Sequence, residues 1–196
     1  MAKAFPREGS VRRRGPVRRS SRTMLIVCGS KETERQYLQG LRDHLRNPAV
    51  SVVVRGKACS PTQLVAYARG QRDLNKGGYD EVWCVFDVDE YPDVAEAAAV
   101  ARRNGIRVAV SNPCFELWLL LHFADHRAHV ATYKKLQPLL EKWVPGYDKT
   151  RVDFGRYRDG VGEAGERARK LDPTGEAHTR NPSTSVWRLT DRMTNP

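Results

Sequence analysis

Short apolar runs recur along the first half of the chain. Each has five to seven residues, contains β-branched side chains, and is bounded by glycine, proline or charged residues. Such runs are typical of strands that are buried on both faces of a parallel sheet. We therefore predict four strands, at residues 24–28, 50–54, 81–87 and 106–110.

Segments with helical periodicity separate these runs. The first follows Gly29, and its apolar side chains fall on one helical face: Tyr37, Leu38, Leu41 and Leu45. The second has Ser60 as its N-cap, Pro61 at its first helical position, and Gln63, which completes a capping box. A third helix is expected at residues 92–104. This alternation predicts an α/β fold with a four-stranded, mostly parallel sheet and helices on its faces.

The second half of the chain is mainly helical in character. Residues 115–123 are apolar nearly all round, which predicts a buried helix. A further helix at residues 130–143 is expected to be interrupted or kinked at Pro138, because proline lacks the backbone N–H that a helix uses. Amphipathic helices are predicted at residues 160–171 and 183–193, the last one capped by Ser183.

One folded domain is expected at residues 24–196, preceded by a basic arm at residues 1–23. Within the domain, residues 24–123 form the predicted α/β core and residues 124–196 the mainly helical extension. A chain of 196 residues, 40% hydrophobic, is long enough for one such domain with a proper core.

The arm carries most of the net charge of +11, since it holds eight lysines and arginines and only one acidic residue. It has too few apolar side chains to bury, so it is expected to be disordered in the free protein. A flexible arginine-rich arm pairs with phosphates, which makes nucleic acid the expected partner. The alternative is a merely solubilising leader.

Cysteine usage and hydropathy indicate a cytoplasmic protein. The four cysteines are far apart in the sequence and form no C-x-x-C pair, so disulfides and a structural zinc site are not expected. No apolar run approaches the length of a membrane span, and the start of the chain lacks the apolar segment of a secretory signal.

The candidate chemistry lies at the end of the third predicted strand, where Asp87 and Asp89 close an apolar run and Glu90 and Asp93 follow. The carboxyl ends of parallel strands are where α/β folds place ligand sites. Clustered carboxylates are costly unless a cation neutralises them, and Mg²⁺ prefers such oxygen ligands. We therefore expect a site for Mg²⁺, or for Mn²⁺ in its place. The alternative is that Asp87 caps a turn.

Three histidines, His122, His126 and His129, have a spacing that would put them on one helical face. This resembles a zinc-ligand arrangement. However, His122 follows an apolar run, where a hydrogen-bonded core histidine is the commoner outcome.

Three segments in this order resemble the RloB family, whose core is similar to the TOPRIM domain of primases, topoisomerases and OLD-type nucleases. The C-terminal segments at residues 146–150 and 181–186 are similar as well, so the resemblance covers residues 24–193 and leaves out the arm. The three segments are Leu25–Cys28 with Thr33 and Glu34, Val85–Glu90, and Ser111–Phe123.

The resemblance implies a compact TOPRIM-like, or Rossmann-like, βα core. It places a catalytic glutamate after the first strand and a D-x-D pair after the third, with these two strands side by side. It also implies Mg²⁺-dependent cleavage of DNA or RNA, a role in bacterial antiphage defence, and an ATPase as a possible partner.

The chain departs from the family pattern at one position, because Gly29 stands where the family has a glutamate in the order Cys-Glu-Gly. In one interpretation the acid has moved. Glu34, which matches the family's Thr-Glu pair, or else Glu32, then supplies the carboxylate, and Glu116 is a further candidate. Lys149 is expected to contact a phosphate or the transition state.

In the other interpretation hydrolysis is weak or lost. The backbone N–H groups of Gly29 and Ser30 then cradle a phosphate, and the protein is a catalytically silent binding subunit of a defence complex with an ATPase partner. On the first interpretation Asp87, Asp89 and Glu34 hold the metal, and the catalytic residues are these three with Glu116 and Lys149.

Overall fold

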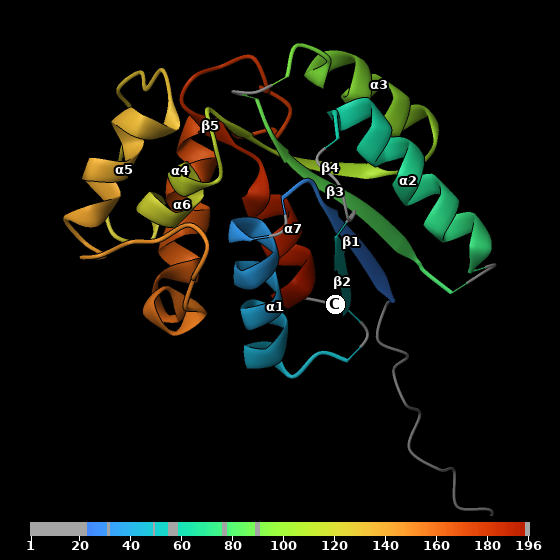
Figure 1. Ribbon diagram of the computed structural model, residues 1–196, viewed down its shortest axis with the longest axis horizontal. Helices are drawn as coiled ribbons and strands as arrows, with labels where there is room; N and C mark the ends of the chain where they lie inside the picture. Colours follow the sequence, from blue (N-terminus) through green and yellow to red (C-terminus); the bar gives the residue numbers. More distant parts are fainter. Residues whose placement is uncertain are drawn as a thin grey trace, which may run out of the picture.

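The computed structural model describes residues 23–30, 32–48, 50–54, 59–75, 78–88 and 91–194. These residues form an α/β fold with one open sheet in the strand order β2-β1-β3-β4-β5 (Figure 1). The first four strands are parallel, as predicted, and a two-residue strand adds an antiparallel edge. The strands are β1 (Met24–Cys28), β2 (Val50–Val54), β3 (Glu81–Asp87), β4 (Arg107–Asn112) and β5 (Ser183–Thr184).

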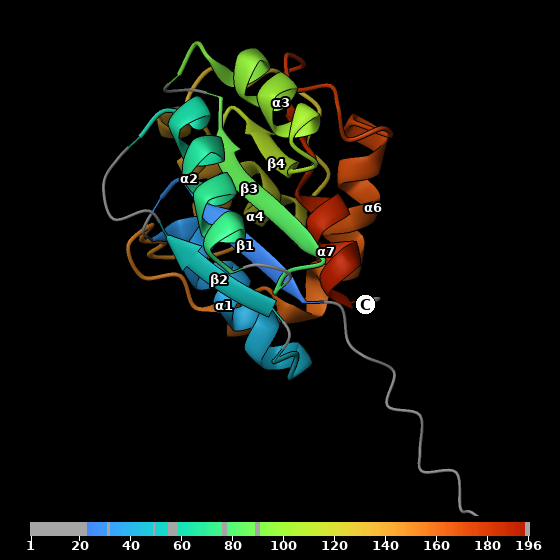
Figure 2. The same ribbon diagram turned by 90° about the vertical axis from the view of Figure 1, so that its right-hand side faces the viewer.

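Helices cover both faces of the sheet (Figures 1 and 2). One face carries α2 (Pro61–Leu74) and α3 (Val94–Arg103), which pack on the smaller of the two apolar clusters. The opposite face carries the larger cluster and the remaining helices. These are α1 (Thr33–Leu45), α4 (Glu116–Leu121), α5 (Tyr133–Glu141), α6 (Val161–Leu171) and α7 (Val186–Thr194).

The two cores follow from the alternation of side chains along each strand. In β1, Ile26 and Cys28 belong to the larger cluster, whereas Leu25 and Val27 belong to the smaller one. The larger core extends well beyond the sheet because α4 is buried on all sides. No helix in the described part of the chain is long and apolar enough to cross a membrane.

Two local predictions about the second half were wrong. Helix α5 continues through Pro138, so the predicted interruption is absent: proline removes a single N–H donor, while Leu136 and Leu140 anchor one face of the helix in the core. Ser183 does not cap the last helix. It lies in β5, where its hydroxyl donates to the Ala177 carbonyl, and α7 starts three residues later.

The strand order brings the carboxyl ends of β1 and β3 together. The chain leaves β1 toward β2 on one side and later returns to β3 on the other, so the order reverses between β1 and β3. This reversal is the topological switch point, where open α/β sheets bind their ligands. In register, Cys28 lies beside Val85, and Asp87 lies beside Ser111 of β4.

Candidate functional site

Asp87 ends β3 and is half-buried. By strand alternation it lies on the same side as Trp83 and Val85, which belong to the larger core. The next residue, Val88, donates its N–H to the carbonyls of Ser111 and Pro113, at 3.0 and 3.2 Å. These two hydrogen bonds hold the end of β3 against the end of β4 and the connection that follows it, and they thereby fix the backbone next to Asp87.

Glu34 lies on the same side of the sheet, in the first turn of α1. The residue is only 3% exposed, and its carboxylate accepts a hydrogen bond from the Ser30 hydroxyl. Burial raises the pKa of the Cys28 thiol at the end of β1, and the nearby Glu34 carboxylate raises it further. Glu34 is therefore a buried acid that follows the carboxyl end of β1, on the side of the sheet that α1 covers.

Glu116 begins α4 and is equally buried, at 4% exposure. Tyr147 donates its hydroxyl to Glu116 Oε1 at 2.9 Å. Burial and the Glu116 charge raise the pKa of Tyr147 above its usual value, and a hydrogen-bond contact with Thr33 opposes this shift. Tyr147 thus bridges Glu116 and the first turn of α1, where Thr33 precedes Glu34.

Lys149 belongs to the segment at residues 147–152, which docks on α1. The Thr33 hydroxyl donates to the Lys149 carbonyl at 3.0 Å, and the Gln36 amide donates to the Thr150 carbonyl at 2.7 Å. The Lys149 ammonium lies 5.3 Å from the ring centroid of Tyr133, a cation–π distance. Lys149 is therefore held at the same end of α1 as Glu34.

The oxygen donors suit the expected metal. Asp87 and Glu34 offer carboxylate oxygens, the ligand type that Mg²⁺ and Mn²⁺ prefer. Asp89, the third expected ligand, lies outside the described residues. Within the described part of the chain there is no group of three histidine, cysteine or acidic side chains arranged to hold a metal. The metal set of Asp87, Asp89 and Glu34 therefore stays a prediction.

The structure contradicts the predicted phosphate cradle at the N–H of Gly29. The Gly29 N–H donates to the Val85 carbonyl at 2.9 Å, so the sheet already uses it. A Cβ at position 29 would meet Val85, Phe86 and Leu64 at 3.5 to 3.8 Å, which is ordinary contact. A side chain there would start on the side of α2, opposite to Ser30 and Glu34.

His122 is a core residue. Its Nε2 lies 2.9 Å from the Tyr37 hydroxyl and its Nδ1 lies 2.9 Å from the Trp118 carbonyl. Helix α4 ends at Leu121, so His126 and His129 do not continue its face. The hydrogen bonds of the ring explain why the helical spacing of the three histidines does not produce a zinc site here.

The tyrosines of the site were missed as functional residues. Tyr147 was part of a motif noted in the sequence, but nothing local linked it to Glu116, which lies 31 residues away. Tyr133 had no local signal either. The basic arm lies almost wholly outside the described residues. Thr23, its last residue, is bound to Asp80 through both its N–H and its hydroxyl.

Comparison with known proteins identifies one family. No curated protein and no solved structure matches the chain. The family model described as RloB-like protein matches residues 24–193, which is the whole described domain apart from its ends. The chain therefore belongs to the RloB-like family.

Proposed function

We propose that the protein is a Mg²⁺-dependent nuclease of the TOPRIM type that cleaves DNA or RNA in antiphage defence. The observation that carries the proposal is the presence of two buried or half-buried acids, Glu34 and Asp87, on one side of the sheet at its switch point. Carboxylates held away from solvent in this position are typical of functional sites.

The three acids share one proposed role. Asp87 and Asp89 would hold the cation together with Glu34, and the cation would supply charge stabilisation and a nucleophile at neutral pH. The hydrogen bond from Ser30 orients the Glu34 carboxylate.

Lys149 is the proposed phosphate contact. A lysine that already lies against a tyrosine ring has lost part of its freedom, so less entropy is lost when it binds a phosphate. Tyr147 is a positioning residue, because its bond to Glu116 and its contact with Thr33 join α4, the 147–152 segment and α1. Glu116 then shapes the site through Tyr147.

Cleavage of labelled DNA and RNA with Mg²⁺ or Mn²⁺ tests the proposal. We expect Asp87→Asn to lower the rate by about 100-fold or more, the cost of losing one group that stabilises the transition state. The matched control is Asp43→Asn, an equal change of charge at the far end of α1, where the side chain is 66% exposed. Equal cleavage by wild type and Asp87→Asn would assign the activity to a contaminant.

A second candidate is a catalytically silent subunit that binds nucleic acid and acts with an ATPase partner. Gly29 favours it, because the family's catalytic glutamate is missing at that position. Two variants separate the candidates. Strong activity gained by Gly29→Glu, absent from wild type, supports the silent subunit. An active wild type that is inactivated by Glu34→Gln supports the relocated acid.

A further inference from the structure

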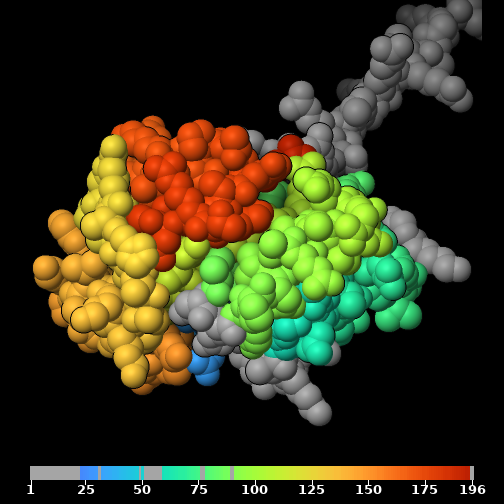
Figure 3. Space-filling view, turned by 90° about the horizontal axis from the view of Figure 1, so that it is seen from above, coloured from blue at the N-terminus to red at the C-terminus, as the bar shows by residue number. Residues whose placement is uncertain are grey.

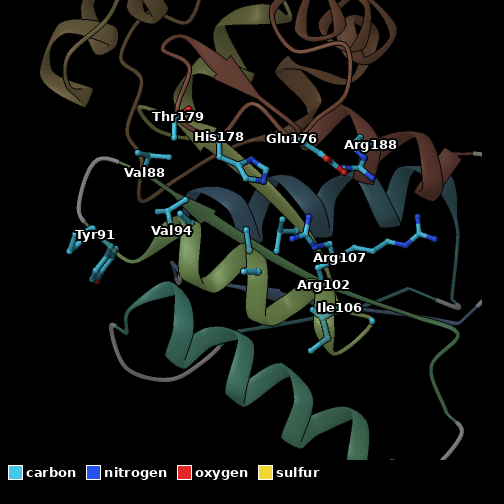
Figure 4. A pocket seen from close by; sticks show the side chains of 16 residues that line it. Val88, Tyr91, Val94, Arg102, Ile106, Arg107, Glu176, His178, Thr179 and Arg188 are labelled. Carbon is cyan, nitrogen blue, oxygen red and sulfur yellow. The ribbon is translucent and has the colours of Figure 1, made fainter.

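A groove of about 790 Å³ runs along the edge of the sheet, between α3 and the chain that leads into β5 and α7 (Figures 3 and 4). One end is formed by Val88 and Tyr91, next to the end of β3. The other end is formed by three arginines, Arg102, Arg107 and Arg188. The groove therefore connects the acidic end of the sheet with a basic cluster.

The wall between these ends is apolar and made of alanine, valine and isoleucine side chains. Helix α3 contributes Val94, Ala95 and Ala98, and the start of β4 contributes Ile106 and Val108. Small side chains leave a shallow, even surface, and such a surface accepts a planar base. Pockets of about 300–1,000 Å³ enclose ligands of drug size, which corresponds to about one or two nucleotides.

The basic end keeps an excess of positive charge. Arg107 lies 3.8 Å from Glu81, but Arg192 already binds that carboxylate through two nitrogens. Arg188 lies 4.0 Å from Glu176, at the limit of an ion pair. Arg102 is exposed and has no carboxylate partner within the described chain. An anion in the groove thus meets Arg102 together with two arginines that are only partly neutralised, Arg107 and Arg188.

The wall opposite α3 has a fixed shape because of a buried aspartate. Asp172 is 1% exposed, and its two oxygens accept the N–H groups of Gly175 and Ala177 at 2.8 and 3.0 Å. This loop carries His178, whose ring points into the groove (Figure 4). The shape of this wall is therefore set before any ligand binds.

We infer that the groove holds a single strand of nucleic acid beside the cleaved phosphodiester, with bases on the α3 wall and phosphates on the arginines. The inference rests on the proposed function, since it takes a nucleic acid as substrate. Along β4, Ser111, the partner of Asp87, lies four positions after Arg107, a distance of about 13 Å at 3.3 Å per residue. That is the length of about four stacked nucleotides, of which the groove encloses one or two. A volume of one or two nucleotides cannot enclose a base-paired duplex.

Binding of a fluorescent twelve-nucleotide thymidine strand, measured by anisotropy in EDTA, tests the inference without cleavage. Arg102→Ala is compared with Arg103→Ala, since both residues lie in the last turn of α3 but only Arg102 lines the groove. The two variants have the same net charge and both keep the basic arm, so the nonspecific attraction of the protein for phosphates is the same in both. We expect Arg102→Ala to weaken binding about tenfold and to lower the salt slope by about 0.7, with Arg103→Ala close to wild type.

A groove-filling variant and a duplex complete the test. Ala98→Gln adds volume on the wall without charge and is expected to weaken binding of the strand several-fold. A blunt duplex should bind Arg102→Ala and Arg103→Ala alike. Equal affinity of these two variants for the single strand overturns the inference, as does an equal loss for strand and duplex. If the strand binds in the groove but is not cleaved, the nuclease proposal is refuted and the groove stands. If the strand is cleaved but Arg102→Ala and Arg103→Ala bind it with equal affinity, the groove is refuted and the nuclease proposal stands.

Discussion

The buried His122 makes the stability of the protein sensitive to mild acid. Burial lowers the pKa of His122 from its ordinary 6.5 to about 4, and the charge of Arg167 contributes in the same direction. The ring is neutral in the folded protein at pH 7 and makes two hydrogen bonds, to Tyr37 and to the Trp118 carbonyl. The unfolded chain takes up a proton at this residue well before the folded protein does.

The sign and size follow from proton linkage. Between pH 6.5 and about 4 the unfolded state binds more protons, so the free energy of unfolding falls as the pH falls through this window. The full difference in pKa corresponds to about 3 kcal/mol, and the part lost between pH 7.5 and pH 5 to about 2 kcal/mol. This loss is a large share of the stability of a typical domain.

Urea unfolding at pH 7.5 and pH 5 measures this loss. We expect His122→Gln, which cannot titrate but still hydrogen-bonds, to lose about 2 kcal/mol less than wild type over this interval. His129→Gln, at an exposed position, is the matched control and should follow wild type. Equal pH dependence of His122→Gln and wild type would refute the reasoning. If His122→Gln does not fold, an NMR titration of wild type decides, since a His122 pKa near 6.5 would refute it equally.

Three further predictions concern the frame around the site. Glu81→Gln should lower the free energy of unfolding by about 1–3 kcal/mol at pH 7: burial raises the pKa of Glu81, but hydrogen bonds from Arg192 and the Trp83 indole lower it by more. Urea titrations should show this loss shrinking as the pH falls below about 4, where the carboxylate of wild type takes up a proton. Asp172→Ala should lower the free energy of unfolding by about 3 kcal/mol. It should also speed hydrogen exchange at Gly175 and Ala177, whose N–H groups the Asp172 carboxylate accepts. Gly40→Ala should lower the melting temperature, because its methyl overlaps Phe154, whereas Gly70→Ala on α2 meets no atom within 4 Å and should stabilise by about 0.5–1 kcal/mol.

Much of the fold was predictable because its signals are local. The strands are buried on both faces, so each is a continuous apolar run, and such a run can be recognised without knowing which strands lie beside it. Ser60 accepts the Gln63 N–H as its N-cap, as the capping box predicted. The position of Asp87 at the carboxyl end of β3, beside β1, also followed from the parallel arrangement. Strand β5 was missed because a strand of two residues is too short to show a hydrophobic pattern.

By itself the sequence determined which segments become strands and helices and which acids end them. Tertiary structure alone decided which distant residues contact one another. Thr33 and Lys149 are 116 residues apart, yet their hydrogen bond places the lysine beside α1. The Tyr147 bond to Glu116 and the edge groove likewise join distant elements. Such contacts depend on how whole helices pack on the sheet, and packing depends on the shapes of many side chains together, which no local pattern encodes.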